Sequence, residues 1–185
     1  NNTARYFEYY FKDFPRIIRK NRNGIAVLSG HETQEELLGL GRDILQYFGL
    51  GCRNVSKIYI PKDYDLNGVF GGLYPHAAVM ENNKYANNYD YNKAVWLMSE
   101  FDFLENGFFM IKEDESYASP IATLFFEYYN DLSELKETLE AKKEQIQCIV
   151  SNGFIKNEIA FGATQKPQLW DYADDVDSIK FLSSI

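Results

Sequence analysis

Short apolar runs that alternate with segments of helical period are the feature that most limits the fold of this chain. Residues 25–28 form an apolar run bounded by turn residues, and residues 55–60 form a second one that ends at a proline. Between them, residues 33–36 read Thr-Gln-Glu-Glu, which fits a capping box and predicts a helix start. Strands and helices alternating at this spacing predict an α/β domain with a mostly parallel sheet flanked by helices.

The rest of the chain continues the same alternation. Helices are predicted at residues 3–14, 85–100 and 132–143, and strands at residues 108–112, 121–128, 145–151 and 158–161. Residues 63–75 are rich in glycine and turn formers and read as a loop with at most one helical turn. We find no repeat or linker, so the 185 residues are interpreted as a single domain.

The composition of the chain argues against several classes of protein. A net charge of −8 and a pI near 4.8 argue against non-specific binding of nucleic acid, which needs many cations. No apolar run reaches the roughly 18 residues that a membrane span requires, and no signal peptide is visible. Two cysteines are too few for a disulfide framework, which favours a reducing compartment, and we expect the cytoplasm. Because the sequence does not start with Met, we expect it to be a piece of a longer protein.

Cys52 is the residue with the most chemical potential. It lies in a Gly-rich turn between a predicted helix and a predicted strand, where its sulfur would be exposed beside Arg53. From the local sequence alone, two interpretations of Cys52 are open: a nucleophile, or a small apolar side chain buried in a loop. Cys148 lies within an apolar strand and is expected to be inert. No Cys/His cluster has metal-ligand spacing, and no Gly-rich dinucleotide loop is present.

The segment around Cys52 carries a family resemblance. YFGLGCRNVSK at residues 47–57 resembles the cysteine segment of the acyl-CoA reductases, the Lux-type fatty-acid reductase branch of the aldehyde dehydrogenase superfamily. Supporting stretches are RYFEYYF at 5–11, IIRKNR at 17–22, NKYANNYDYN at 83–92 and LWDYAD at 169–174. The resemblance implies that residues 1–185 form the cysteine-bearing catalytic domain and that the N-terminal cofactor-binding domain is absent from this chain.

The resemblance also implies a mechanism. The Cys52 thiolate would attack an acyl-CoA, expected to be a fatty acyl-CoA, and NADPH would reduce the resulting thioacyl-enzyme to an aldehyde. The backbone amide of Cys52 is one candidate donor to the oxyanion, with Asn54 as a weaker one. Most NADPH contacts are expected in the missing half, so this fragment is expected to be inactive alone. Association is implied too, as a homo-oligomer or with an acyl-activating partner enzyme.

Three further residues are assigned by position. Glu115 lies nearest to the family's ribose-binding glutamate, one residue out of register before a Ser-Pro that resembles the family's Gly-Pro. Arg19 and Lys20 are candidates to contact cofactor or CoA phosphates, against the alternative of a solvated basic turn. All three are therefore predicted cofactor-binding residues.

Two alternatives remain open. The first is an aldehyde dehydrogenase that oxidises aldehydes to acids with NAD(P). The stretch IIRKNR lacks the glutamate that activates water in such enzymes, which counts against it. The second is a non-catalytic interaction domain in which Cys52 is incidental.

Overall fold

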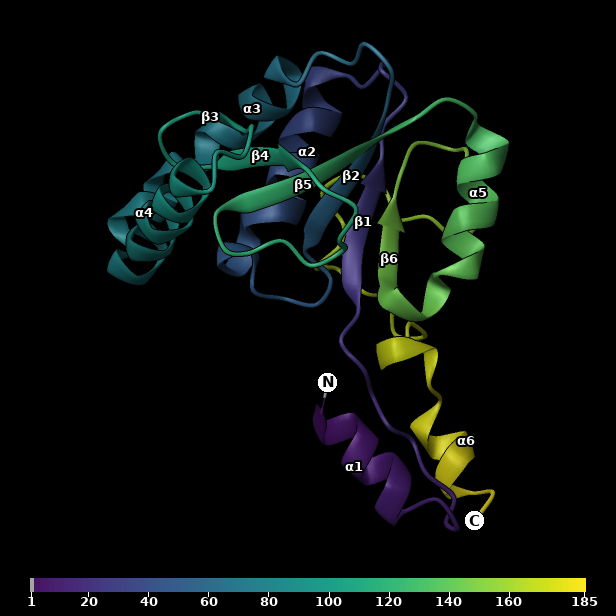
Figure 1. The fold of residues 1–185 in the computed structure, drawn as a ribbon. Coiled ribbons are helices and arrows are strands. Elements are labelled where there is room, and N and C mark those ends of the chain that lie inside the picture. The colour runs from purple at the N-terminus through teal and green to yellow at the C-terminus, as the bar shows by residue number, and fades with distance from the viewer. Residues whose placement is uncertain (1) are drawn as a thin grey trace.

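The computed structural model describes residues 2–185 and contains one six-stranded sheet of order β3-β4-β5-β2-β1-β6 (Figure 1). The strands are β1 (Asn23–Val27), β2 (Val55–Pro61), β3 (Leu104–Glu105), β4 (Met110–Glu113), β5 (Thr123–Tyr129) and β6 (Ile146–Val150). Every neighbouring pair is parallel except β3 with β4. The predicted α/β class with a mostly parallel sheet is confirmed.

Helices cover both faces of the sheet. They are α1 (Asn2–Tyr10), α2 (Gln34–Leu45), α3 (Asn67–Leu73), α4 (Asn83–Met98), α5 (Leu132–Ala141) and α6 (Ser178–Leu182). The short 3-10 turns are η1 (Gln46–Gly49), η2 (Tyr74–Glu81), η3 (Lys143–Gln145) and η4 (Ala173–Asp175). The larger core cluster joins α2, α3 and α4 to one face, and a smaller cluster joins α5 to the other. The predicted capping box forms at the start of α2.

Three predictions about local structure were wrong. Residues 63–75 are mostly helical, because α3 packs on α2 through the contact of Gly41 with Gly72, which outweighs the poor helix propensity of glycine. The first helix ends at Tyr10, where the Arg16 guanidinium donates to the carbonyl oxygens of Phe11 and Lys12.

Residues 158–161 form no strand. A single bridge joins Val150 to Ile159, because the Glu158 carboxylate accepts hydrogen bonds from the backbone of Gly153 and Ile155 and from the Ser151 hydroxyl. These bonds hold the segment in a compact turn. The outer edge of β6 is therefore covered by irregular chain rather than by a seventh strand.

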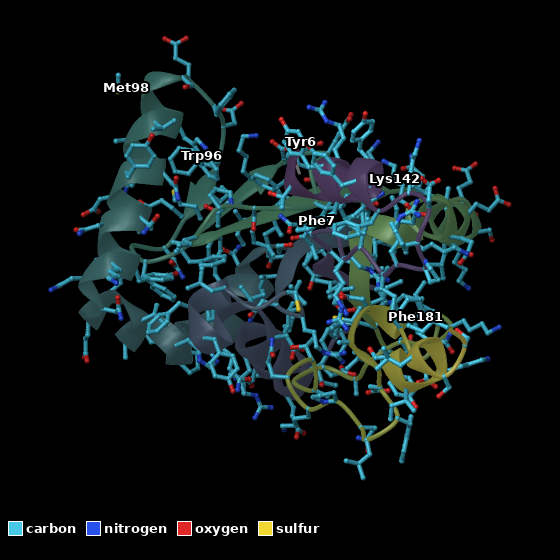
Figure 2. All side chains as sticks on the ribbon, turned by 90° about the horizontal axis from the view of Figure 1, so that it is seen from below. Tyr6, Phe7, Trp96, Met98, Lys142 and Phe181 are labelled. Carbon is cyan, nitrogen blue, oxygen red and sulfur yellow. The ribbon has the colours of Figure 1, made fainter. Side chains whose placement is uncertain are left out.

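Helices α1 and α6 lie side by side in an extension that leaves the domain where β1 and β6 begin (Figure 1). Phe7 and Phe181 line an apolar cleft between the two helices. Figure 2 places both residues far from Met98, at the tip of α4. Six aromatic side chains of residues 6–14 are exposed, which is unusual for a short helix that packs on its own domain. Among residues 2–185, no helix has the length and apolar character needed to cross a bilayer.

The contact between α2 and α3 provides a stability test. A Cβ on Gly41 would lie 2.1 Å from the carbonyl oxygen of Gly72, whereas a Cβ on Gly71 would meet nothing within 4 Å. We expect Gly41→Ala to lower the free energy of unfolding by about 1–3 kcal/mol through overpacking. Gly71→Ala, one residue from the contact, should raise it by about 0.5–1 kcal/mol. Urea denaturation measures both, and equal effects would contradict the close contact.

Candidate functional site

Cys52 lies in the loop between η1 and β2 with its thiol exposed. The start of β2 pairs with Gly24 at the start of β1, so the thiol lies at the amino edge of the parallel strands. The chain reaches this loop through three consecutive residues with positive φ: Tyr47, Phe48 and Gly49. Such a turn is costly for two aromatic residues, and it persists only where the surroundings determine it.

The side chain of Asn54 holds this loop against the end of α2 through hydrogen bonds. Its amide oxygen accepts a hydrogen bond from the Gly51 N–H at 2.8 Å. Its amide nitrogen donates to the carbonyl oxygens of Asp43, Ile44 and Gln46 at 2.8–3.2 Å. Asn54 is buried, and both of its amide hydrogens are engaged. This placement leaves no hydrogen for an oxyanion, so Asn54 acts here as a positioning residue rather than as the predicted donor.

A second chain segment is tied to the same place. The buried Asp43 carboxylate accepts hydrogen bonds from Gly162 N–H, Thr164 N–H and the Thr164 hydroxyl at 2.6, 3.1 and 2.8 Å. The Arg53 side chain donates to the Thr164 carbonyl oxygen. Burial raises the pKa of Asp43, while these three hydrogen bonds oppose the rise. Residues 162–164 therefore form a fixed wall beside the cysteine loop.

Gln165, which directly follows this wall, was missed by sequence analysis. Its amide nitrogen is buried and has no hydrogen-bond partner among the described residues. It faces Gly51, since a Cβ on that glycine would lie 3.3 Å from it. An unpartnered buried donor is costly unless a ligand satisfies it. Nothing in the local sequence signals this proximity, because 114 positions separate Gln165 from Gly51.

The other cysteine differs from Cys52 in exposure. Cys148 is buried in β6, as predicted, and its thiol lies 3.6 Å from the Arg53 carbonyl oxygen. Burial raises the pKa of this thiol to about 12, so it is protonated at neutral pH.

Glu115 lies on the turn after β4, which is held against the first residues of β2. The buried Lys57 ammonium donates to the carbonyl oxygens of Asp114 and Glu115 at 3.0 and 2.7 Å and pairs with the Glu127 carboxylate. The Ser56 hydroxyl donates to the Tyr117 carbonyl oxygen, two residues further along this turn. Burial lowers the pKa of Lys57, and Glu127 opposes that shift. The Glu115 side chain is exposed, and its backbone is hydrogen-bonded to Lys57, which follows Cys52 by five residues in the sequence.

Arg19 and Lys20 are not brought to this site. They lie on the extended segment before β1, where Arg19 pairs with Asp174 at 3.4 Å and Lys20 pairs with Glu8 at 3.3 Å. Both basic side chains are about half exposed, at 50% and 54%. Their predicted contact with phosphates stays a prediction. Among the side chains that the structure describes, no cluster of three or more metal-ligating groups occurs.

Structure comparison finds aldehyde dehydrogenases. An indole-3-acetaldehyde dehydrogenase from P. syringae, a cysteine-to-alanine mutant in complex with NAD+ and IAA, has a TM-score of 0.52 and 11% identity, covering 80% of this chain and 42% of that chain. A gamma-glutamyl-gamma-aminobutyraldehyde dehydrogenase from Burkholderia cenocepacia J2315 has a TM-score of 0.50 and 10% identity, covering 84% and 38%.

These likenesses establish the fold of this chain as the one found in part of those dehydrogenases. The chain spans about two fifths of the length of these structures. No protein-family model matches the sequence, and neither does any curated protein.

The two thiols should react differently. At pH 8 we expect iodoacetamide to alkylate Cys52 in the native protein and to spare Cys148 until the chain unfolds, because one thiol is exposed and the other is buried and protonated. Peptide mass spectrometry after native and denatured labelling measures both sites. Equal labelling in the native state would contradict this arrangement.

The anchor role of Asn54 is also testable. Asn54→Ala leaves one N–H and three carbonyl groups without their partner, so we expect it to lower the free energy of unfolding by about 1–3 kcal/mol. Asn88→Ala is the matched control, since its single bond to the Lys84 carbonyl lies on the surface of α4. Its effect in urea denaturation should stay within about 0.5 kcal/mol. A comparable loss of unfolding free energy in both variants would contradict the anchoring role of Asn54.

Proposed function

We propose that this chain is the cysteine-bearing half of an oxidoreductase that reduces an acyl-CoA to an aldehyde through a thioacyl group on Cys52. The observation that carries the proposal is the exposed thiol on a loop fixed by buried hydrogen bonds from Asn54. The aldehyde dehydrogenase fold supports chemistry at the aldehyde level of oxidation. The resemblance of residues 47–57 to acyl-CoA reductases supports a thioester as the substrate.

In the first step the Cys52 thiolate attacks the thioester carbonyl carbon. A carbon–sulfur bond to Cys52 forms, the bond to the CoA sulfur breaks, and CoA leaves as a thiol after taking up a proton. The oxyanion formed on the way needs hydrogen-bond donors. The backbone N–H of Cys52 and the unpartnered amide of Gln165 are the candidates that this chain offers.

A nicotinamide dinucleotide, when bound, would supply the hydride that, with a proton from solvent, converts the thioacyl group on Cys52 to a hemithioacetal. The exposed Glu115 carboxylate on its rigid turn fits a contact to ribose hydroxyls. We propose that the remaining contacts come from a separate cofactor-binding domain, and that NADPH is preferred. Collapse of the hemithioacetal then releases the aldehyde and restores the Cys52 thiol.

Aldehyde oxidation is the second candidate, because the structural neighbours described above are aldehyde dehydrogenases and one of them is an NAD+ complex. Hydrolysis of a thioacyl group needs a base that activates water. The carboxylate that scaffolds the cysteine loop, Asp43, is buried and accepts three hydrogen bonds, so it is committed to structure. Residues 17–22 also contain no acid. Both features favour transfer of the acyl group between thiols over hydrolysis of the thioacyl group.

A homo-oligomer, an acyl-activating partner enzyme and a cytoplasmic location stay predictions.

Acylation of the thiol tests the proposal directly. On incubation with acyl-CoAs of short and long chain, we expect one acyl group per protein by intact-mass analysis, removable with hydroxylamine. Cys52→Ala should abolish the adduct and Cys148→Ala should keep it, because only Cys52 is accessible.

If no acyl-CoA yields an adduct, on this chain or on a protein that contains it, the thioester mechanism is rejected. An adduct that persists in Cys52→Ala would reject the assigned nucleophile. Consumption of NADPH with release of aldehyde would then separate reduction from oxidation.

A further inference from the structure

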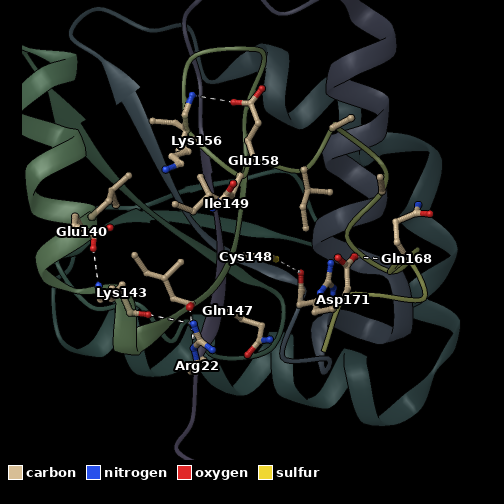
Figure 3. Close-up of a pocket in the computed structure, with 18 of the residues that line it drawn as sticks. Arg22, Glu140, Lys143, Gln147, Cys148, Ile149, Lys156, Glu158, Gln168 and Asp171 are labelled. Atoms are coloured by element: carbon tan, nitrogen blue, oxygen red, sulfur yellow. Dashed lines mark hydrogen bonds and ion pairs between the residues drawn. The ribbon is translucent and has the colours of Figure 1, made fainter. Parts of the chain in front are cut away.

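A cavity of about 930 Å³ lies along the outer edge of β6 (Figure 3). Its walls are α5, β6 and the irregular segment of residues 155–172. In Figure 3, Gln147 and Ile149 of β6 lie at its floor, with Lys156 on one side and Arg22 on another. A cavity of this size accommodates a molecule as large as a nucleotide cofactor.

The cavity is cationic although the protein is acidic. Six basic side chains line it against three carboxylates, while the whole chain has a net charge of −8. The basic residues are Arg22, Arg53, Lys136, Lys143, Lys156 and Lys166, and the acidic ones are Glu140, Glu158 and Asp171. A concave surface of one charge sign concentrates ligands of the opposite sign. The cavity is therefore suited to a polyanion.

The basic groups differ in what they already contact. Lys143 pairs with Glu140 at 2.6 Å, and Arg53 donates to the Thr164 carbonyl oxygen, a bond that leaves its charge in place. In the part of the chain that the structure describes, no ion pair or side-chain hydrogen bond involves the ammonium group of Lys156 or Lys166. These ammonium groups are exposed and can bind phosphate oxygens.

The cavity also contains an unpartnered polar atom. The side-chain oxygen of Gln147 is buried, and no described group donates a hydrogen bond to it. A ligand that carries amide or amino N–H groups would satisfy this acceptor. The apolar side chains of Leu139, Ile149 and Ile155 line the same cavity and suit a ring or an alkyl arm. Phosphates, N–H donors and apolar segments occur together in CoA.

The cavity adjoins the cysteine loop. Arg53, which follows Cys52 directly, lines it, as does Cys148, whose thiol contacts the Arg53 carbonyl oxygen. Ala163 and Lys166, which line the cavity, flank two residues that lie at the cysteine loop. These are Thr164, which contacts Asp43, and Gln165, which faces Gly51. A ligand whose phosphates lie in the cavity would therefore lie next to the cysteine loop.

We propose that this cavity binds the phosphate-bearing portion of the CoA thioester and so directs the thioester carbon to Cys52. The proposal rests on the function proposed above. It assigns to Lys156 and Lys166 the contacts with phosphate, and to the Gln147 oxygen a contact with an N–H group of CoA.

Comparison of two thioesters of the same acyl group tests the proposal. One is the acyl-CoA, and the other is the acyl-pantetheine, which has no phosphate. At low salt and subsaturating thioester, Lys156→Gln combined with Lys166→Gln should slow acylation of Cys52 by acyl-CoA roughly tenfold, as expected for loss of two charge-assisted contacts. Acylation by acyl-pantetheine should be unchanged. Lys12→Gln combined with Lys84→Gln, two exposed lysines outside the cavity, is the control and should change neither rate.

Equal slowing of both thioesters, or no slowing of either, would overturn the cavity assignment. Binding of CoA to the Cys52→Ala protein, followed by calorimetry, gives a readout without acylation. Binding that weakens with salt and in the cavity variant supports the cavity even where Cys52 is never acylated, which would reject only the proposed reaction. Acylation of Cys52 without such binding rejects only the cavity.

Discussion

The amide group of Asn54 is the interaction on which the candidate site depends. It joins one N–H of the cysteine loop to three carbonyl groups at the end of α2, and all of these partners are backbone. Asp43 extends the same scaffold to residues 162–164. Because the groups are buried, each lost bond leaves a polar group without water or partner. These buried hydrogen bonds therefore hold the backbone of the cysteine loop in place.

The thiol lies at an edge of the sheet that general rules would not select. In open parallel sheets, ligands usually bind beyond the carboxyl ends of the strands. Cys52 precedes β2 and so lies at the amino edge, where the α1–α6 extension also leaves the domain. The cationic cavity reaches this edge through Arg53. The amino edge thus holds the thiol, the extension and the basic surface together.

Sequence periodicity predicted β1, β2, α2 and α5 because each buries one regular face. It also singled out Cys52, whose flanking turn residues are local. It did not predict the role of Asn54, since the partners of that amide lie 8–11 residues earlier and are carbonyl groups that carry no sequence signal. The cavity was missed because its basic residues come from segments that are far apart in the sequence. Within each segment, these residues have the pattern of an ordinary solvent-exposed surface. Glu158 was assigned to a strand, whereas its carboxylate holds a turn by accepting hydrogen bonds from backbone N–H groups. Every residue except proline has such a group, so residue types do not reveal these bonds.

The hydrogen bonds of Asn54 also change the electrostatics of the thiol's surroundings. The carboxyl end of a helix carries a partial negative charge of about half an electron, located on its last unpaired carbonyl oxygens. Helix α2 ends at Leu45, seven residues before Cys52, so the cysteine loop follows this end of the macrodipole. The Asn54 amide places its positive hydrogens on three of these oxygens. One neutral side chain therefore reduces the negative charge at the helix end that precedes the cysteine loop.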